Sequence, residues 1–395
     1  MNNIFSNKVS NLKPSAIREI LKATSQPGVI PFAAGNPAPE AFPIEKIVEI
    51  SNELLVENPI LALQYSITEG YPPLIKFVKG LLFKKHYIND GDEVIITSGA
   101  QQGVELSCKT LCNEGDTIIC EAPTFIGTLN AFRSYNVNLV GVPVDDDGIN
   151  IDLLETALIK NPNTKFIYLI PNFQNPSGIT MSREKREAVY SLAHKYDVFI
   201  VEDDPYGDLR FEGEDLPSIK ALDKDDRVIY CGSFSKVLAP GLRVGYVCAP
   251  KEVISKITVC KQASDVHTNI WAQAICQRFF DRNDYFAHTE KLSEIYKKKC
   301  KLMLDNMKFE LPTSINFVEP EGGLFIWATL PDECDMLEFC KAAVKNMVAV
   351  VPGTAFMVDE TAPTNSFRLN FSTPTDEQIV EGVNILGKVA RELIK

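Results

Sequence analysis

Short apolar runs alternate with amphipathic stretches between about residues 92 and 250. Each run is rich in β-branched residues and bounded by polar or turn residues, and amphipathic stretches such as 182–195 lie between most of the runs. Strands of this kind that alternate with helices are typical of a mainly parallel sheet with helices on both faces. The predicted strands cover residues 94–97, 117–120, 139–142, 166–170, 198–201 and 228–231.

The pattern changes after about residue 285. A long charged helix is predicted over 289–308, short strands near 323–329 and 366–371, and a final amphipathic helix over 375–394. A chain of 395 residues is also longer than one compact core usually holds. We therefore predict an α/β fold in three parts: a large domain (46–285), a smaller α+β domain (286–395), and an N-terminal arm (1–45) that packs with the small domain.

Charge and cysteine usage exclude several classes of partner. The formal net charge of −12 argues against nucleic acid or an anionic membrane, because both require clustered positive charge. No apolar run reaches membrane-spanning length, and the first residues lack the pattern of a signal peptide. The ten cysteines form no CxxC pairs and lie mostly in apolar runs, as expected for free thiols in a reducing compartment. We expect a cytoplasmic protein without a metal site.

Polar clusters follow the predicted strands, where ligands bind in parallel sheets. The first cluster, 97–103, contains Gly99, Ala100 and Gln101 in a strand-to-helix turn, and exposed amides at a helix N-terminus bind phosphate well. A plain helix start capped by Ser98 is the alternative. The second cluster, 171–178, contains an Asn-Pro-x-Gly turn that can simply reverse the chain, yet its Asn175 comes directly after a buried strand.

Two further clusters carry charge. Glu202, Asp203 and Asp204 close one strand, and three adjacent carboxylates are costly there unless one has a cationic partner. A protonated pyridine nitrogen is such a partner for Asp203, whereas a helix-capping acidic turn is the alternative. Lys236 follows the next strand, and a lysine amine can form a Schiff base. Nearby hydroxyls and an arginine suit a phosphate, although a lysine in a Ser-rich loop is usually a solvated surface residue. These phosphate candidates are Ser233, Ser235 and Arg243.

In combination, the motifs Asn-Pro-Ser-Gly, Asp-Asp-Pro-Tyr-Gly and Ser-Phe-Ser-Lys with Arg243 resemble those of fold-type I, pyridoxal-5′-phosphate (PLP)-dependent aminotransferases of class I/II. The resemblance covers nearly the whole chain. Residues 32–37 and 63–66 resemble the subgroup of 2-aminoadipate and kynurenine aminotransferases. The resemblance implies a homodimer that moves an amino group between an L-amino acid, with glutamate or 2-aminoadipate as candidates, and a 2-oxo acid by a ping-pong mechanism.

The resemblance also implies residue roles. Lys236 would bind the cofactor and carry the proton, Asp203 would keep the pyridine nitrogen protonated, and Phe125 would stack on the ring. Arg368, with Gly35 and Asn175, would bind the substrate α-carboxylate. The remaining cofactor contacts would be Asn175 and Tyr206 at the 3-oxygen; Gly99, Ala100, Gln101, Ser233, Ser235 and Arg243 at the phosphate; and Tyr65 at the phosphate of the neighbouring subunit.

Three positions need separate comment. Phe125 and Ala100 stand where the family often has tyrosine and a hydroxyl residue, so each loses one hydroxyl without affecting proton transfer. Arg18 lies in a segment, 15–20, that resembles a mobile N-terminal helix of the subgroup, whose arginine binds the distal carboxylate of the substrate. The alternative for Arg18 is a surface arginine paired with a glutamate.

Other functions remain open at this point. The same lysine and aspartate serve a β-lyase or a decarboxylase, although Arg368 favours transamination. A non-catalytic ligand sensor, like the aminotransferase-like parts of some bacterial regulators, would need a DNA-binding domain, and about 45 residues before the main fold leave no room for one. A structural α/β protein with coincidental motifs is the third alternative.

Overall fold

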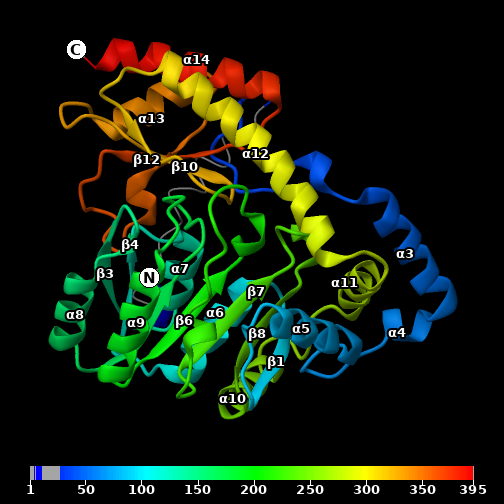
Figure 1. The fold of residues 1–395 in the computed structure, drawn as a ribbon. Helices are drawn as coiled ribbons and strands as arrows, with labels where there is room; N and C mark the ends of the chain where they lie inside the picture. Colours follow the sequence, from blue (N-terminus) through cyan, green and yellow to red (C-terminus); the bar gives the residue numbers. More distant parts are fainter. Residues whose placement is uncertain (1–3, 5, 11–26, 395) are drawn as a thin grey trace.

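The computed structural model describes residues 4, 6–10 and 27–394. The main sheet of the described chain has eight strands in the order β1-β8-β7-β6-β5-β2-β3-β4, and it is mainly parallel, as predicted (Figure 1). The six predicted strands all form, with boundaries shifted by a few residues. The strands are β1 (Asp92–Thr97), β2 (Thr117–Ala122), β3 (Asn138–Asp145), β4 (Gly148–Ile149), β5 (Thr164–Leu169), β6 (Phe199–Asp204), β7 (Val228–Ser233) and β8 (Gly245–Pro250).

Two strands of this sheet were not predicted, and both run against the others. β8 pairs antiparallel with β1 on one side and with β7 on the other, and β4 pairs antiparallel with β3. Every residue of β8 is buried. The insertion of β8 between β1 and β7 places the loop after β7, which carries Lys236, beside the end of β1.

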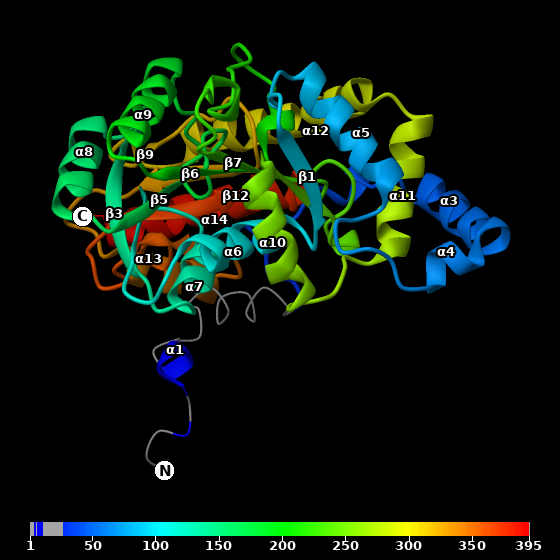
Figure 2. The same ribbon diagram turned by 90° about the horizontal axis from the view of Figure 1, so that it is seen from below.

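Helices cover both faces of the sheet, as Figure 2 shows. Alternate residues of a strand point to opposite faces, so Phe166 and Val201 enter one core while Ile167 and Ile200 enter the other. On one face lie α6 (Ala100–Leu111), α7 (Ile126–Arg133) and α10 (Lys251–Gln262), and on the other α8 (Ile151–Lys160) and α9 (Arg183–Lys195). The helix α5 (Pro72–Lys84) packs against β1 and against α11 (Ile270–Arg282), and α11 also contacts α3 (Ile44–Glu57) and α4 (Pro59–Leu63).

A smaller antiparallel sheet has the order β11-β12-β10-β9. The long helix α12 contacts η2 (Gly207–Leu209), which follows β6, and packs against α14 beside the small sheet (Figure 1). It begins at Tyr285, four residues before the predicted start, because Asp284 accepts a hydrogen bond from the Ala287 amide and caps the helix there. The elements are β9 (Asn316–Phe317), β10 (Phe325–Thr329), β11 (Val351–Pro352), β12 (Ser366–Asn370), α12 (Tyr285–Glu310), α13 (Met336–Lys345) and α14 (Asp376–Leu393).

Residues 27–37 run along the small sheet. The Ile30 amide donates to Met347 O at 2.8 Å, and the Asn370 amide donates to Phe32 O at 2.8 Å. Ser372 Oγ donates to Asn36 O at 2.7 Å. These bonds fix the backbone around Gly35 beside the ends of the main-sheet strands. Arg18 lies outside the described residues.

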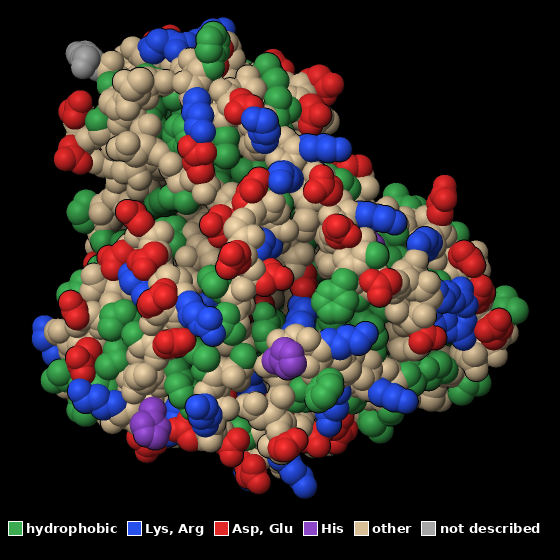
Figure 3. Space-filling model, viewed as in Figure 1, with side chains coloured by type: hydrophobic (Ala, Val, Ile, Leu, Met, Phe, Trp, Pro, Cys, Tyr) green, Lys and Arg blue, Asp and Glu red, His purple; other side chains and the backbone are tan. Residues whose placement is uncertain are grey.

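The surface and the thiols add a few facts. On the face seen in Figure 3, acidic and basic side chains are interspersed, so this face has no large cluster of one sign. All ten cysteines are free thiols and most are buried. None of the helices in the described ranges is both long and apolar enough to cross a membrane. The described residues contain no group of three or more acidic, histidine or cysteine side chains that could hold a metal ion.

Candidate active site

A cavity of about 690 Å³ lies where the carboxyl ends of β5, β6 and β7 meet the small sheet. It brings together residues predicted from four separate clusters of the sequence. The predicted residues that line it are Gly35, Ala100, Gln101, Phe125, Asn175, Asp203, Tyr206, Ser233, Ser235, Lys236, Arg243 and Arg368. Gly99 and Tyr65 do not line it, and Arg18 is outside the described residues.

Lys236 comes three residues after the end of β7. Its Nζ donates a hydrogen bond to Gly35 O at 2.7 Å, so its amine points across the cavity toward residues 33–36. Burial, aided by the positive charges of Arg368 and Arg243, lowers the pKa of Lys236 to about 8. A lysine with this pKa is partly neutral near physiological pH, as a nucleophile or a base must be.

The three carboxylates at the end of β6 separate by strand alternation. Glu202 and Asp204 point away from the cavity and accept hydrogen bonds, Glu202 from the Lys220 amide and Asp204 from Tyr230. Asp203 points into the cavity and is 5% exposed, and its Oδ1 has no hydrogen-bond partner among the described residues. Burial raises the pKa of Asp203 to about 7. Of the three carboxylates, Asp203 is therefore the one that has an oxygen available for the predicted cationic partner.

The turn before α6 lies against Arg243. Gly99 has φ of +81°, and a side chain at this position would collide with the Arg243 guanidinium, so the turn requires glycine. Arg243 Nη2 donates to Ser98 O at 3.2 Å, and Nη1 lies 3.4 Å from Ser235 Oγ. The first-turn amides of Ala100 and Gln101 have no partner within the helix by virtue of their position. Together these groups form a site suited to an anion.

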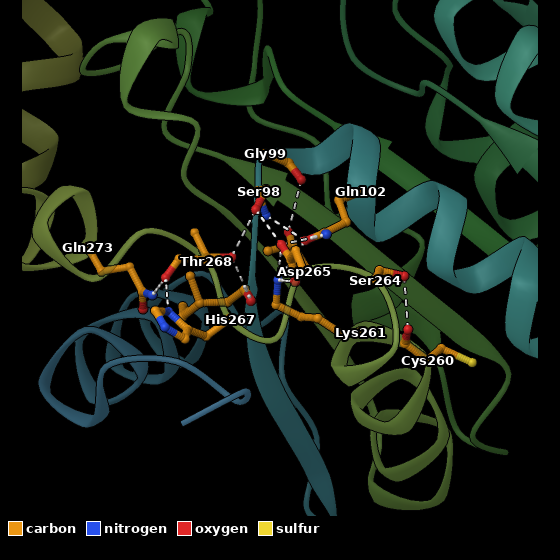
Figure 4. A network of polar contacts seen from close by, with 12 residues as sticks. Ser98, Gly99, Gln102, Cys260, Lys261, Ser264, Asp265, His267, Thr268 and Gln273 are labelled. Atoms are coloured by element: carbon orange, nitrogen blue, oxygen red, sulfur yellow. Dashed lines mark hydrogen bonds and ion pairs between the residues drawn. The ribbon is translucent and has the colours of Figure 1, made fainter. Parts of the chain in front are cut away.

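A network of polar contacts behind this turn holds it in place (Figure 4). Ser98 was the predicted cap in the alternative reading, but Gly99 occupies the cap position and no side chain caps the helix. Ser98 Oγ instead donates to Asp265 Oδ2 at 2.8 Å, and the Ser98 amide donates to Gln102 Oε1 at 2.8 Å. The buried Lys261 ammonium donates to both Asp265 oxygens at 2.8 Å. An ion pair on α10 and its following loop thus fixes the start of α6.

Phe125 caps the start of α7 and lines the cavity. Its ring lies over Gly127, where a Cβ atom would come within 2.6 Å of the ring. Gln101 Nε2 donates to Gly127 O at 3.1 Å, so the side chain of Gln101 holds this loop. The backbone N–H of Gln101 remains available to the anion site. The Phe125 ring is therefore a flat apolar wall beside that site.

Arg368 is fully enclosed on the opposite side of the cavity. Its guanidinium lies between the rings of Phe325 and Phe356, 4.3 and 5.0 Å from their centres. Its Nη1 donates to Asn175 Oδ1 at 2.8 Å, and Nη2 donates to Ala33 O at 2.9 Å. The Asn175 amide in turn lies 3.4 Å from the Tyr206 hydroxyl. Asn175 therefore connects the arginine to the ring-binding side of the site.

Tyr65 lies on the surface and is 82% exposed. Its ring is nearly perpendicular to the ring of His267, a residue labelled in Figure 4, and the two ring centres lie 5.9 Å apart. Tyr65 is therefore accessible from outside its own chain and lies apart from the cavity.

Several cavity residues were not predicted. Phe325 follows two glycines that pack against Phe173, and this Gly-Gly pair was a signal of close packing in the sequence. Ile126 and Asn130 lie one helical turn apart on α7, the helix that begins after Phe125. The unpredicted lining residues are Ala33, Ala34, Asn36, Ile126, Gly127, Asn130, Ile170, Pro205, Pro240 and Phe325.

A larger cavity of about 760 Å³ lies elsewhere, between η2 and α12. Its central charges already pair with protein groups: Lys85 with Asp208, and Arg210 with Glu321 at 2.7 Å. The smaller cavity, by contrast, holds the Lys236 amine together with an Asp203 oxygen that has no hydrogen-bond partner among the described residues. The smaller cavity is therefore the better candidate for chemistry.

The residues of the smaller cavity fit PLP. Asp203 Oδ1, which has no partner among the described residues, could accept a hydrogen bond from a protonated pyridine nitrogen, Lys236 could bind an aldehyde, and the α6 turn with Arg243 could bind a phosphate. Phe125 supplies a flat wall for a planar ring.

Comparison with known proteins agrees with a PLP-binding site in this chain. The sequence profile of aminotransferase class I and II matches residues 27–386. An aromatic-amino-acid aminotransferase of Thermococcus litoralis is 40% identical over 99% of this chain and 95% of its own length. A 2-aminoadipate transaminase of Thermus thermophilus is 36% identical over 99% of this chain and 97% of its own. The kynurenine aminotransferase of Pyrococcus horikoshii, crystallised with PMP, superposes with a TM-score of 0.95 at 37% identity, covering 99% of this chain and 98% of that one.

These relatives are all aminotransferases, and none of the comparisons favours a β-lyase or a decarboxylase. The profile covers most of the chain, from the segment along the small sheet to α14. The chain belongs to the class I and II aminotransferases and is a PLP-dependent transaminase, which moves an amino group between an amino acid and a 2-oxo acid.

Proposed function

We propose that the cavity holds PLP with its ring nitrogen at Asp203, its aldehyde at Lys236 and its ring against Phe125. The 3-oxygen would lie at Asn175 and Tyr206. The phosphate would lie at Gly99, Ala100, Gln101, Ser233, Ser235 and Arg243. When bound, the cofactor supplies the electron sink for the charge left on the substrate Cα. The observation that carries this proposal is that Asp203 Oδ1, without a hydrogen-bond partner in the part of the chain that the structure describes, lies in the same cavity as the Lys236 amine.

Lys236 and Arg368 divide the work on the substrate. Lys236 Nζ would take the proton from the substrate Cα, because its lowered pKa leaves it partly neutral. Arg368, which donates a hydrogen bond to Asn175, would bind the α-carboxylate with its planar fork, and Gly35 would line the same cavity. Closure of the small domain (286–395) over the large domain (46–285) would exclude water from this site.

For the donor, we propose an acidic amino acid, glutamate or 2-aminoadipate. One relative is a 2-aminoadipate transaminase, and Arg18 is the candidate for binding the distal carboxylate. Aromatic amino acids are the second candidate class. The apolar lining that Phe125, Ile126 and Phe325 give the cavity favours them, as does the relative named an aromatic-amino-acid aminotransferase.

A screen of single half-reactions tests the donor. The purified holoenzyme is mixed with one amino acid at a time while the cofactor absorbance is followed. Conversion by glutamate and 2-aminoadipate at a higher kcat/KM than by phenylalanine supports the acidic donor, and the reverse order supports the aromatic one. Release of ammonia or carbon dioxide without conversion of the cofactor would contradict transamination itself.

Replacing Arg18 with alanine is expected to raise KM for glutamate roughly tenfold, because a charge-assisted contact to the distal carboxylate is lost. KM for phenylalanine should change by less than about twofold, since phenylalanine has no distal carboxylate. Steady-state kinetics with both donors provides the measurement. Equal changes for the two donors would show that Arg18 is a surface residue without a role in substrate binding.

We also propose a cytoplasmic homodimer in which Tyr65 reaches the phosphate of the neighbouring subunit. An exposed apolar surface around Tyr65 supports this proposal, because stable interfaces between two copies of a chain bury apolar surface of this kind. This surface includes Val56, Ile60, Leu63, Tyr65 and Ile67. Sedimentation equilibrium should give twice the chain mass of 43.9 kDa. A monomer that retains full activity would contradict the shared site.

A further inference from the structure

A tyrosine of the neighbouring strand holds the carboxylate that we assign to the cofactor. Tyr168 lies in β5 and its hydroxyl donates to Asp203 Oδ2 at 2.7 Å. The other oxygen of this carboxylate, Oδ1, has no partner among the described residues, and Asp203 lines the cavity. One oxygen is thus fixed by the protein, while the other is left for a ligand.

Tyr168 is itself fixed on all sides. It is fully buried, and its ring is nearly perpendicular to the Phe132 ring, with the two ring centres 5.5 Å apart. The Thr128 hydroxyl lies 3.0 Å from the Tyr168 hydroxyl. Because the single hydroxyl proton of Tyr168 goes to Asp203, the Thr128 hydroxyl must donate to the tyrosine oxygen. The hydrogen bonds therefore run from Thr128 to Tyr168 to Asp203.

This chain of hydrogen bonds begins in the loop of the ring-stacking residue. Thr128 lies in the first turn of α7, and its amide donates to Phe125 O at 3.1 Å. Phe125, Thr128, Tyr168 and Asp203 therefore form one hydrogen-bonded unit that spans α7, β5 and β6. The unit fixes the distance between the wall beside the cofactor ring and the carboxylate at its nitrogen.

We propose that Tyr168, supported by Thr128, is a positioning residue: it keeps Asp203 in its carboxylate form, with the free oxygen directed at the ring nitrogen of the cofactor. This inference rests on the proposed role of Asp203. A hydrogen bond donated to a carboxylate stabilises its charged form. Burial raises the pKa of Asp203 to about 7, and the Tyr168 hydrogen bond opposes that rise.

The other groups that face Asp203 cannot replace Tyr168. The neighbouring negative charge of Asp204 raises the pKa of Asp203 further. Cys231, its partner in β7, is a buried thiol whose pKa lies well above its usual range. Burial likewise raises the pKa of Tyr206, and its hydroxyl lies beside Asn175. Tyr168 is therefore the one hydrogen-bond donor that the described residues give to this carboxylate.

The test measures the affinity of the full-length apoenzyme for pyridoxamine 5′-phosphate between pH 6 and 9. This probe carries the same ring and phosphate but no aldehyde, so it does not react with Lys236. In Tyr168→Phe, removal of the hydrogen bond raises the pKa of Asp203, so the loss of affinity on acidification should begin at a higher pH than in the wild type. At pH 7 we expect a loss of roughly tenfold, and a much smaller one at pH 9, where the carboxylate is ionised in both proteins.

Tyr230→Phe is the matched control. Tyr230 is also fully buried and donates to the adjacent carboxylate, Asp204, at 2.9 Å, but Asp204 does not line the cavity. This variant should bind the probe as the wild type does at every pH. Thr128→Val should shift the profile in the same direction as Tyr168→Phe but by less, and Thr128→Ser should restore it. The threonine pair also keeps the test decisive if Tyr168→Phe folds poorly.

Asp203→Asn separates this inference from the proposed function. If Asp203→Asn lowers affinity and Tyr168→Phe follows the wild-type profile, the positioning role is wrong and the role of Asp203 stands. If Asp203→Asn itself binds the probe normally, the role of Asp203 is wrong. A loss in Tyr168→Phe that is equal at every pH would also overturn the inference, because it would indicate general damage to the site.

Discussion

Replacing Lys236 with alanine is expected to lower the rate of transamination by at least about 10⁴-fold, because in the proposed site this one side chain supplies both the covalent link to the cofactor and the proton transfer. The only other cationic side chains among the described lining residues are Arg243 and Arg368, and a guanidinium group is suited to binding anions rather than to acting as a base. Conversion of the cofactor in a single turnover, followed by absorbance, gives the rate. A loss of less than about tenfold would show that another group moves the proton.

The Lys236→Ala variant should fold at least as stably as the wild-type apoenzyme. The pKa of Lys236 is lowered to about 8 in the folded protein, so below that pH the folded state holds a charge that burial disfavours. Between about 8 and the ordinary lysine pKa, the unfolded chain binds more protons than the folded one, so stability rises with pH in that range. The variant should lose this rise, which thermal unfolding at several pH values can measure. Lys236→Arg keeps the charge and should be equally inactive, which separates loss of the base from loss of the charge.

The fold was largely predictable because the central strands are buried on both faces. Runs such as Phe166–Leu169 are apolar at every position, and that pattern identifies a covered parallel strand regardless of tertiary context. β8 is equally buried, yet neither this strand nor its antiparallel direction was predicted. The direction of a strand depends on how the chain connects it to its neighbour. The link from Lys236 to Gly245 is short, but it indicates an antiparallel pair only when β7 and β8 are known to be neighbours.

Residues of the candidate site could be predicted where their type and their position at the end of a strand were enough to identify them. Asp203 and Lys236 are polar residues at strand ends, and the strand ends of a parallel sheet meet at one edge. Tyr168 was not predicted because an aromatic residue inside an apolar strand has the pattern of a core residue, and only the structure shows its hydroxyl against Asp203. Ser98 illustrates the opposite error: it precedes a helix as a capping residue would, but a distant aspartate, Asp265, binds its hydroxyl.

The largest expected effect on substrate binding concerns Arg368. In Arg368→Lys, KM for α-amino acids should rise by roughly 10²-fold, because a lysine ammonium cannot form the planar two-point contact with a carboxylate. The replacement keeps the positive charge but loses the fixed geometry that Phe325, Phe356 and Asn175 impose on the guanidinium. Phenethylamine, which is phenylalanine without its carboxylate, is the matched control and should react at the same rate in both proteins. If phenethylamine loses as much as phenylalanine, Arg368 supports the cavity in general and does not bind the carboxylate.

The same variant also tests whether both halves of the reaction use one site. The donor leaves as a 2-oxo acid, and a second 2-oxo acid then takes the amino group, so each substrate presents a carboxylate next to the carbon that reacts. In the described cavity, Arg368 is the arginine held between aromatic rings on the side opposite the α6 turn, whereas Arg243 lies at that turn. Arg368→Lys should therefore raise KM for the 2-oxo acid by about the same factor as for the amino acid, measured with each half-reaction run separately. A rise for the donor alone would show that the acceptor carboxylate is bound by other groups, and that the two half-reactions do not share one carboxylate site.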